Sequence, residues 1–262
     1  MGLTTLLGGK GAPVTATRCG GAQAAWAHWQ GSRAEQQDAC GVFCNGSLML
    51  AAVADGMGGL ARGAQAARAA IEACARETPT LAKQPLEFET LHEALLRINR
   101  AVHDAVGRPR AALSGTTLVA AAVQQGSLRL MWSGDSRAYL WRRGKLIPLT
   151  FDHNYERQLL SLAAEGRLTE DQARSHPKGA HLTGYLGLRE PQEYSISGTA
   201  TEVARGDALL LCTDGLYHAL GEGALRKYLS LDAEKAAGAL IRAVARVNAP
   251  NQDNATACVV RW

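Results

Sequence analysis

Short apolar runs separated by turn-forming residues mark the first part of the chain. Ala22 to Trp29, Gly41 to Cys44 and Leu48 to Ala54 have the length and apolar character of β-strands. Asn45-Gly46 lies between the second and third runs, and this dipeptide is typical of a two-residue hairpin turn. The pattern therefore predicts three strands, of which the last two form a hairpin.

Two amphipathic helices are expected next, over Leu60 to Arg76 and Leu86 to Val106. In the second helix, apolar residues recur at alternating spacings of four and three, which places them on one face. This stripe consists of Leu91, Leu95, Ile98 and Val102. It predicts one buried side on that helix.

The middle of the chain returns to strand patterns, joined by turns at Gln125-Gly126 and Arg143-Gly144. Apolar and other residues alternate there with the period of two that a strand requires. The expected strands are Thr116 to Val123, Leu128 to Trp132 and Ala138 to Arg142. They predict an antiparallel meander.

The segment from His153 to Tyr185 has a helical but polar pattern, with a capping box at Thr169 and Gln172. It ends in the glycine-rich Lys178 to Gly187, so we expect a mobile insertion near the site. The remaining expected elements are a strand at Ala208 to Cys212, two helices within Glu222 to Val247, and a strand at Ala255 to Val260.

Strands at both ends and in the middle, with paired helices between them, do not follow the regular alternation of a parallel α/β protein. We therefore expect an α+β fold in which two antiparallel sheets pack together and helices cover them. Hydrophobic residues make up 47% of the 262, and nothing in the composition divides residues 22–262 into two domains. Residues 1–21 lack the features of a secretory signal and are expected to form a flexible arm.

Composition and charge exclude several classes of protein. The apolar stretches are far shorter than the roughly 20 residues of a membrane-spanning helix, so no membrane association is expected. A net charge of +4 without a dense basic run gives no reason to expect nucleic-acid binding. The cysteines form no CxxC pair, which favours reduced, buried thiols in a cytoplasmic protein over a zinc site. They are Cys19, Cys40, Cys44, Cys74, Cys212 and Cys258.

Five aspartates share one local context, because each lies beside a predicted strand and most precede glycine or a small polar residue. They are Asp38, Asp55, Asp135, Asp214 and Asp253. Each alone could belong to an ordinary turn. If strand ends bring them together at one edge of a sandwich, their like charges would need cations between them. Carboxylate oxygens suit Mg²⁺ or Mn²⁺ better than zinc.

The motifs of this chain, taken in order, resemble those of the bacterial PP2C-type metal-dependent protein phosphatases. The blocks are Arg33 to Asp38, Asp55-Gly-Met-Gly-Gly59, Ser114-Gly-Thr-Thr117, Gly134-Asp-Ser-Arg-Ala-Tyr139, Leu149-Thr-Phe-Asp-His153, Gly206 to Gly215 and Asp253-Asn254. Each block alone is weak evidence, but seven in the order of the family make the resemblance specific. The resemblance covers residues 22–262 and implies an αββα sandwich with metal ions at one end of the sheets.

The resemblance also implies which residues hold the ions. Asp55 bridges two ions of Mn²⁺ or Mg²⁺, Gly56 offers its carbonyl, and Asp214 and Asp253 complete the second ion's shell. Asp135 matches, with Asp214, the place where bacterial members of the family bind a third ion.

Further roles carried over from the family concern the substrate. Asp38 would hold metal-bound water, and Arg33 matches the residue that grips the substrate phosphate. Residues 153–185 match the flap that affects substrate choice. Gln36 and Met57 depart from the family pattern: Asn is commoner at the first position, and eukaryotic members have a His thought to act as general acid at the second.

These features together predict a serine/threonine protein phosphatase that hydrolyses phosphate monoesters with a metal-activated water. We expect a cytoplasmic monomer that acts on phosphorylated proteins, the products of a serine/threonine kinase. A phosphohydrolase of small esters and a phosphoprotein-binding pseudo-phosphatase are the alternatives. A nuclease is disfavoured because no basic groove with interleaved aromatic residues is evident.

Overall fold

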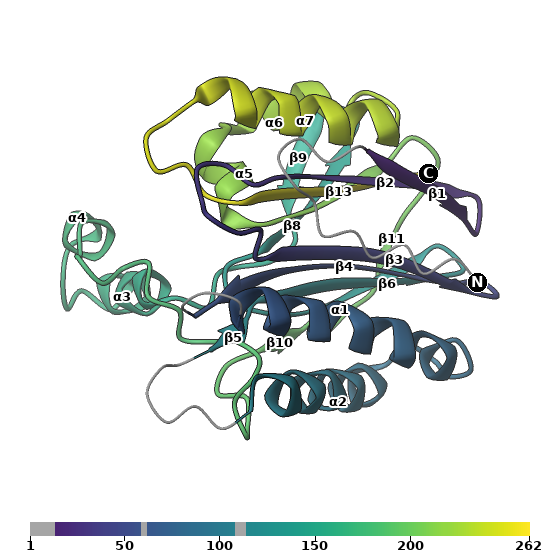
Figure 1. The fold of residues 1–262 in the computed structure, drawn as a ribbon, viewed down its shortest axis with the longest axis horizontal. Coiled ribbons are helices and arrows are strands. Elements are labelled where there is room, and N and C mark those ends of the chain that lie inside the picture. The colour runs from purple at the N-terminus through teal and green to yellow at the C-terminus, as the bar shows by residue number, and fades with distance from the viewer. Residues whose placement is uncertain (1–13, 59–61, 108–113) are drawn as a thin grey trace.

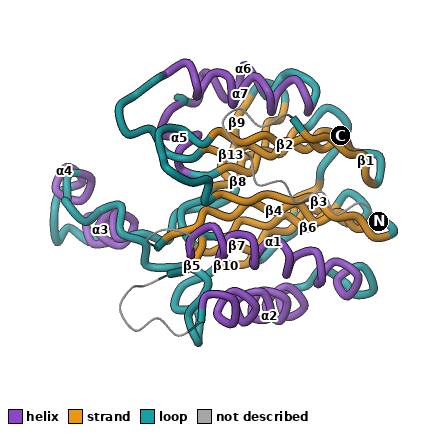
Figure 2. The backbone as a smooth tube through the Cα atoms, viewed as in Figure 1, coloured by secondary structure: helices purple, strands orange, loops and turns teal. Residues whose placement is uncertain are grey.

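The computed structural model describes residues 14–58, 62–107 and 114–262. Two antiparallel sheets pack face to face, with helices on both outer sides, as Figures 1 and 2 show. The helices α1 (Arg62–Leu81) and α2 (Phe88–Val106) cover one sheet, and α5 (Asp214–Ala219), α6 (Glu222–Tyr228) and α7 (Ala233–Val247) cover the other. The expected α+β sandwich is confirmed.

The sheet beneath α1 and α2 has seven strands, with β10, β7, β6, β4 and β3 in spatial order, while β11 pairs with β7 and β5 with β4. Their bounds are β3 Asp38–Asn45, β4 Leu48–Met57, β5 Gly115–Thr116, β6 Leu118–Gln124, β7 Ser127–Ser133, β10 Ser195–Ile196 and β11 Thr201–Glu202.

The other sheet has six strands in the order β1, β2, β13, β12, β8, β9. Their bounds are β1 Thr15–Cys19, β2 Ala22–Trp29, β8 Arg137–Arg142, β9 Lys145–Pro148, β12 Ala208–Cys212 and β13 Ala255–Arg261.

Strand β4 shows why the inner strands are apolar throughout. Leu48 and Leu50 face the helices, while Met49 and Val53 face the other sheet. A strand that is buried on both faces needs apolar residues at every position, so its sequence is a continuous apolar run.

Turns and helices follow the sequence pattern closely. Gln125-Gly126 and Arg143-Gly144 both have positive φ at each residue (52° and 80°, 51° and 79°), as tight two-residue hairpins require. The apolar stripe predicted for α2 is fully buried. The predicted start of α1 at Leu60 lies outside the described residues. Its predicted end at Arg76 is wrong, since the helix continues through Pro79 and buries Leu81.

The predicted meander is wrong in its third strand. β6 and β7 pair as expected, but β8 pairs with β12 and β9 in the other sheet. The chain crosses between the sheets at Gly134, where φ is 101° and a Cβ would lie 2.6 Å from Cγ2 of Thr117. Only glycine fits this close crossover without displacing its neighbour.

The boundary predicted for the N-terminal arm is also wrong. Thr15–Cys19 forms β1, which pairs with β2 through a tight turn at Gly20 and Gly21. Polar residues alternate along β1 because it lies at the edge of its sheet, and this pattern hid the strand. Residues 1–13 of the expected arm lie outside the described residues.

Two of the six cysteines contradict the expectation of reduced thiols. Cys19 in β1 and Cys44 in β3 form a disulfide, with their Cα atoms 6.0 Å apart. They are 25 residues apart in sequence, and only the stacking of the two sheets brings them together. Cys40, Cys74, Cys212 and Cys258 are free and buried, as predicted.

The insertion over residues 153–185 contains α3 (Tyr155–Ala164) and α4 (Glu170–Arg174), which project from one end of the sandwich in Figure 1. The capping box of Thr169 and Gln172 is present at the start of α4. At the base of the insertion, the Thr183 N–H donates to the carbonyl of His153, at 3.0 Å. His153 also accepts from the Gly134 N–H at Nδ1, so it anchors the insertion as well as the crossover.

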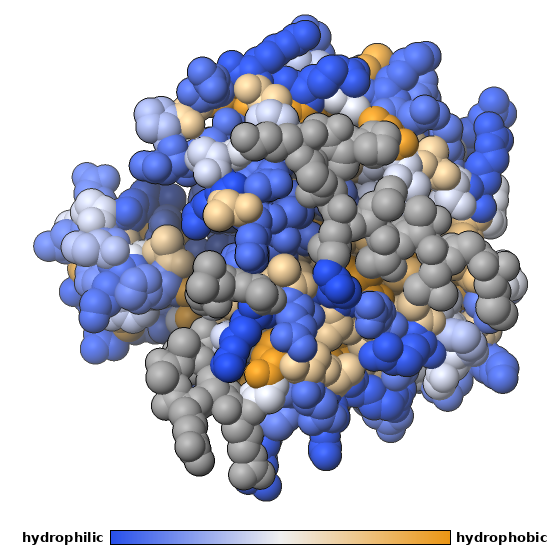
Figure 3. Space-filling view, viewed as in Figure 1, coloured by the Kyte–Doolittle hydropathy of each residue, from blue (hydrophilic) through white to orange (hydrophobic). Residues whose placement is uncertain are grey.

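Among the described residues, no helix is long and apolar enough to cross a membrane. On the face drawn in Figure 3, hydrophilic residues predominate and apolar ones form small separate areas.

Candidate active site

The five predicted aspartates come from both sheets and meet at one end of the sandwich. Asp38 begins β3 and Asp55 lies in β4, directly opposite it in the strand register. Asp214 begins α5 just after β12, and Asp253 stands just before β13. Asp135 lies in the crossover between β7 and β8. The sequence prediction that strand ends position these carboxylates is therefore confirmed.

Asp38 is fully buried and is held from the opposite sheet. Its Oδ2 accepts hydrogen bonds from the hydroxyls of Thr213, at 2.8 Å, and Thr256, at 2.7 Å. Its backbone N–H donates to the side-chain oxygen of Gln36 at 3.0 Å, so this glutamine fixes the backbone of Asp38. The other oxygen, Oδ1, is buried without a partner among the described residues.

The backbone around Asp55 is fixed by two threonines. The Asp55 N–H donates to the Thr117 hydroxyl, and the Thr116 hydroxyl donates to the Asp55 carbonyl, both at 2.9 Å. A Cβ on Gly56 would lie 2.0 Å from the carbonyl oxygen of Gly63 in α1. Only glycine therefore allows the helix to pack so closely beside this strand.

Asn254 ties the loop that carries Arg33 to the strand that follows Asp253. Its side chain accepts from the Gln37 N–H at 2.7 Å and donates to the carbonyls of Gln30 and Glu35, at 2.8 and 3.1 Å. In this arrangement Nη2 of Arg33 donates to Oδ2 of Asp253 at 2.6 Å. The Arg33 side chain is 56% exposed, so its guanidinium stands at the rim of the site.

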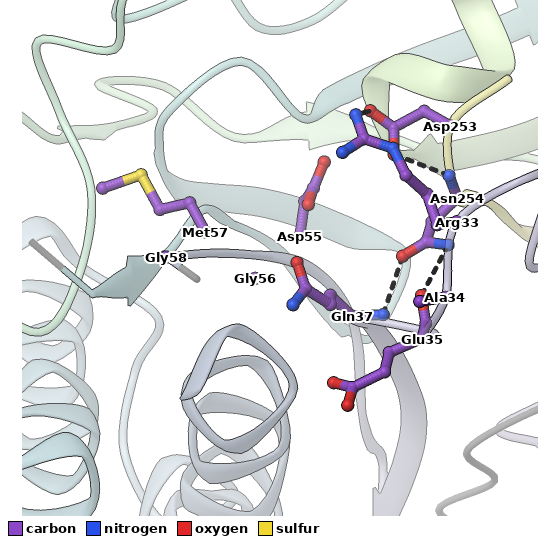
Figure 4. A pocket seen from close by; sticks show the side chains of 10 residues that line it. All are labelled: Arg33, Ala34, Glu35, Gln37, Asp55, Gly56, Met57, Gly58, Asp253 and Asn254. Carbon is purple, nitrogen blue, oxygen red and sulfur yellow. Dashed lines mark hydrogen bonds and ion pairs between the residues drawn. The ribbon is translucent and has the colours of Figure 1, made fainter. Parts of the chain in front are cut away.

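Two hollows meet at Asp55. The first, of about 480 Å³, is lined by Arg33 and Asp253 among others, and the second, of about 450 Å³, by Asp135 and Asp214. Asp55 and Met57 line both. Figure 4 shows Asp55 between the side chain of Met57 on one side and the Arg33–Asp253 pair on the other.

The second hollow is partly roofed by the insertion. Ala180, His181 and Leu182 come from the glycine-rich end of that segment, and Tyr185 follows them. Apart from its aspartates, this hollow has mainly apolar walls, whereas the first contains the cation of Arg33.

Burial and mutual repulsion raise the pKa values of four of the aspartates. Burial, and then Asp38, Asp214, Asp135 and Asp253, raise the pKa of Asp55 well above its ordinary range. Burial raises the pKa of Asp38 to about 7 against the opposing effect of its two threonine hydrogen bonds. Burial also raises the pKa of Asp135 to about 7, with Asp214 adding to the rise. Burial and Asp253 raise the pKa of Asp214. Such upward shifts are typical of buried carboxylates crowded together without a cation between them, and a bound divalent cation would favour their ionised forms.

The carboxylate oxygens of the site are of the type that hard divalent cations prefer. In this structure, however, the side chains are not arranged closely enough to enclose one ion. Within the described ranges, no group of three Asp, Glu, His or Cys side chains is placed to hold one ion, and Asp253 pairs with Arg33 instead. However, Oδ1 of Asp38 and Oδ1 of Asp214 are both buried without hydrogen-bond partners in this part of the chain. Buried carboxylate oxygens without donors are what Mg²⁺ or Mn²⁺, or its bound water, satisfies.

A family model described as protein phosphatase 2C matches residues 28–257. The chain belongs to this family. The serine/threonine protein phosphatase PstP of Mycobacterium tuberculosis is 32% identical over 231 residues, which are 87% of this chain and 42% of that protein. The chain therefore spans less than half the length of this relative. The serine/threonine phosphatase stp of Listeria innocua is 32% identical over 203 residues, covering 75% of this chain and 78% of its own length.

Solved structures confirm the protein phosphatase 2C fold. The PPM Ser-Thr phosphatase MsPP from Mycobacterium smegmatis, in complex with cacodylate, superposes with a TM-score of 0.74 at 32% identity. The match covers 91% of this chain and 97% of that one. The catalytic domain of PstP in complex with two manganese ions gives a TM-score of 0.69 at 29% identity and covers 92% and 97%. The resemblance inferred from the motifs is thus confirmed.

Several residues that support this protein phosphatase 2C site were not singled out by sequence reasoning. Thr213, Thr256 and Asn254 hold the aspartates and the Arg33 loop through contacts with residues far away in the sequence. Thr213 and Asn254 lie within two of the motif blocks but were given no role there, and Thr256 lies just outside them. His28, which contacts Thr256, gave no signal at all.

Proposed function

We propose that the chain is a metal-dependent phosphatase of phosphoserine and phosphothreonine in proteins. The observation that carries this is the meeting of Asp38, Asp55, Asp214 and Asp253 at one end of the sandwich. Asp38, Asp214 and Asp253 all raise the pKa of Asp55, and Asp253 also raises the pKa of Asp38 and Asp214. Arg33 stands beside them as the cation for a phosphate group. Relatives named serine/threonine phosphatases support the same activity.

Hydrolysis of p-nitrophenyl phosphate and of a phosphothreonine peptide, each with Mn²⁺ and then with excess EDTA, tests the proposal. We expect turnover of both substrates with Mn²⁺ and none with EDTA. Turnover that survives EDTA would rule out the metal mechanism. Turnover of the small ester without the peptide would favour the small-ester phosphohydrolase, and no turnover at all would favour the pseudo-phosphatase.

Asp55, Asp214 and Asp253 would hold the ions, with the carbonyl of Gly56 as an additional ligand. A relative solved with two manganese ions supports Mn²⁺ as the occupant. When bound, two such ions would lower the pKa of a water molecule and so supply the nucleophile for the phosphate ester. Asp38 would orient this water through Oδ1, since Oδ2 is already occupied by two threonine hydroxyls.

Arg33 would bind the phosphate. Its planar guanidinium offers two parallel donors to phosphate oxygens, and its exposure leaves it free to turn from Asp253. With Asp253 engaged by an ion, Arg33 would be free to pair with the substrate.

We expect Arg33→Ala to raise KM for phosphopeptides by about 10-fold to 100-fold, the range of a charge-assisted hydrogen bond, with a smaller change in kcat. The pattern follows because a group that grips phosphate stabilises substrate and transition state alike. Steady-state kinetics measure it. Arg100→Ala, an exposed arginine on α2, is the matched control. A change confined to kcat would contradict the role.

Asp135 would hold a third ion together with Asp214. Its position in the crossover is fixed by the Tyr217 hydroxyl, which donates to its backbone carbonyl at 3.1 Å. An ion held by few carboxylates keeps more waters and binds more weakly than one in a full shell. Occupancy of this ion should therefore depend on metal concentration in a range where the first two sites are full.

Accordingly, Asp135→Ala should lower turnover while leaving two strongly bound ions. Calorimetric titration with Mn²⁺ counts the ions, and turnover across the same concentrations shows whether the weak one matters. If the variant matched the unmodified protein at every Mn²⁺ concentration, Asp135 would be only a turn residue.

We propose phosphorylated proteins, made by a serine/threonine kinase, as substrates. The second hollow at Asp55, roofed by Leu182 and walled by Tyr185, has room for a side chain next to the phosphoresidue. Residues 153–185 would in this way influence which phosphoproteins are accepted.

A further inference from the structure

A buried histidine that the proposed mechanism does not use lies behind Asp38. His28 is in β2, only 1% exposed, and stands directly opposite Thr256 in the register with β13. It is two residues from Trp26, which packs between the two sheets, so His28 lies on the same inner face of its strand. This places an imidazole inside the seam of the sandwich.

The histidine continues the hydrogen bonds that hold Asp38. Nδ1 of His28 lies 2.8 Å from the Thr256 hydroxyl oxygen, and that hydroxyl lies 2.7 Å from Oδ2 of Asp38. The hydroxyl has only one proton, and a carboxylate oxygen can only accept. If Thr256 donates to Asp38, it must accept from His28, which therefore carries its proton on Nδ1.

The surroundings of the ring agree with this tautomer. Nε2 of His28 is buried and has no hydrogen-bond partner within the described part of the chain. A proton there would leave a buried N–H without an acceptor, and Nδ1 would then compete with Asp38 for the Thr256 proton. Burial also lowers the pKa of His28 to about 4, which keeps the ring neutral.

We propose that His28 is a positioning residue: acting through Thr256, it keeps Oδ2 of Asp38 saturated and so leaves Oδ1 as the oxygen that serves the metal site. This inference rests on the proposed function. Thr213 supplies the second donor to Oδ2 and itself accepts from the Thr256 N–H at 2.9 Å. The hydrogen bonds thus run in one direction, from His28 toward Asp38.

Partners of this kind commonly matter for metal sites. Removal of a residue that orients a metal-site carboxylate typically lowers metal affinity or activity 10-fold to 100-fold. Without the His28 donor, the Thr256 hydroxyl loses the bond that fixes its rotation, and the orientation of Asp38 loosens.

The tautomer can be observed directly. In protein labelled with ¹⁵N-histidine, long-range ¹H–¹⁵N correlation spectra should show His28 neutral with the proton on Nδ1, both with and without Mg²⁺. The spectra are recorded above the pKa of about 7 that burial gives Asp38, so that this carboxyl is ionised even without metal. His28→Asn identifies the signals by their loss. A proton on Nε2, or a charged ring, would overturn the proposal, whether or not the chain is a phosphatase.

Two variants then separate positioning from packing. His28→Asn keeps a side-chain N–H near the place of Nδ1, whereas His28→Leu has similar bulk but no donor. We expect His28→Leu to weaken Mn²⁺ binding, measured by calorimetry, and to lower kcat for p-nitrophenyl phosphate, each by about tenfold. His28→Asn should stay within about threefold on both measures, since it keeps the donor.

Thermal melting in EDTA shows whether packing alone explains the result. Equal Mn²⁺ affinity in His28→Leu and the unmodified protein, with only a lower Tm, would overturn the proposal. So would an equal loss in both variants. If His28→Leu does not fold, the proposal is tested by the tautomer of His28 and by Mn²⁺ binding to the His28→Asn variant. Tenfold weaker Mn²⁺ binding in the folded Asn variant would then contradict the proposal.

Discussion

Asp55→Asn should abolish Mn²⁺-dependent turnover while leaving the fold intact. Asp55 lines both hollows and is electrostatically coupled to the other four aspartates, so its loss affects every ion of the site. Removal of the proposed metal ligand should forfeit several kcal/mol of transition-state stabilisation, or about 10³-fold in rate. Hydrolysis of p-nitrophenyl phosphate at saturating Mn²⁺ measures this loss.

The same variant should melt at an equal or higher temperature than the unmodified protein in EDTA. Its backbone stays fixed by Thr116 and Thr117, and the substitution removes a partly buried carboxyl that its neighbours repel. Asp104→Asn, at an exposed carboxylate on α2, is the control and should change neither rate nor Tm. A folded Asp55→Asn variant with a near-normal rate would disprove the ligand role.

Chelation should destabilise the protein, and more so at neutral than at acidic pH. Asp38 and Asp135 have an ordinary pKa of 3.8, and burial raises both to about 7 in the folded chain. Between these pH values the folded state therefore binds more protons than the unfolded state. The free energy of unfolding of the metal-free protein accordingly falls as pH rises from about 4 to about 7.

Added Mn²⁺ reverses this trend because the ions replace the protons. At a metal concentration about 100 times Kd, each bound ion contributes about 2.7 kcal/mol, which for a chain of this length raises Tm by about 5–10 °C. We expect this rise in full at pH 7.5 and only a small part of it at pH 5. Calorimetric melting with EDTA and with Mn²⁺ at both pH values measures it. A rise of equal size at both would contradict the coupling, and Asp55→Asn should show a much smaller rise.

The local sequence pattern was sufficient to predict those features that depend on a residue and its near neighbours in the chain. The hairpin turns, the stripe on α2 and the aspartates at strand ends all depend on periodicity or on turn chemistry within a few residues. The seven motif blocks added the order in which these ends converge. For that reason the sandwich and the site aspartates could be predicted together.

Features that depend on distant parts of the chain could not be predicted. β8 has the same alternation whether it extends the meander or joins the other sheet, and the crossover at Gly134 depends on how closely Thr117 approaches. The disulfide between Cys19 and Cys44 exists only because two sheet edges stack. Likewise, nothing in the sequence around His28 indicates a role, which depends on Thr256 and Asp38 lying beside it in the fold.

The division of the aspartates between the two sheets has a mechanical consequence. Asp38 and Asp55 belong to the seven-stranded sheet, whereas Asp214 and Asp253 adjoin strands β12 and β13 of the six-stranded one. The hydroxyls of Thr213 and Thr256 on Asp38 already link the two sheets, and an ion held by both Asp55 and Asp214, as proposed, would add a second link. Any change that separates the sheets at this end would then also release the metal, so that loss of activity and opening of the sandwich would occur together.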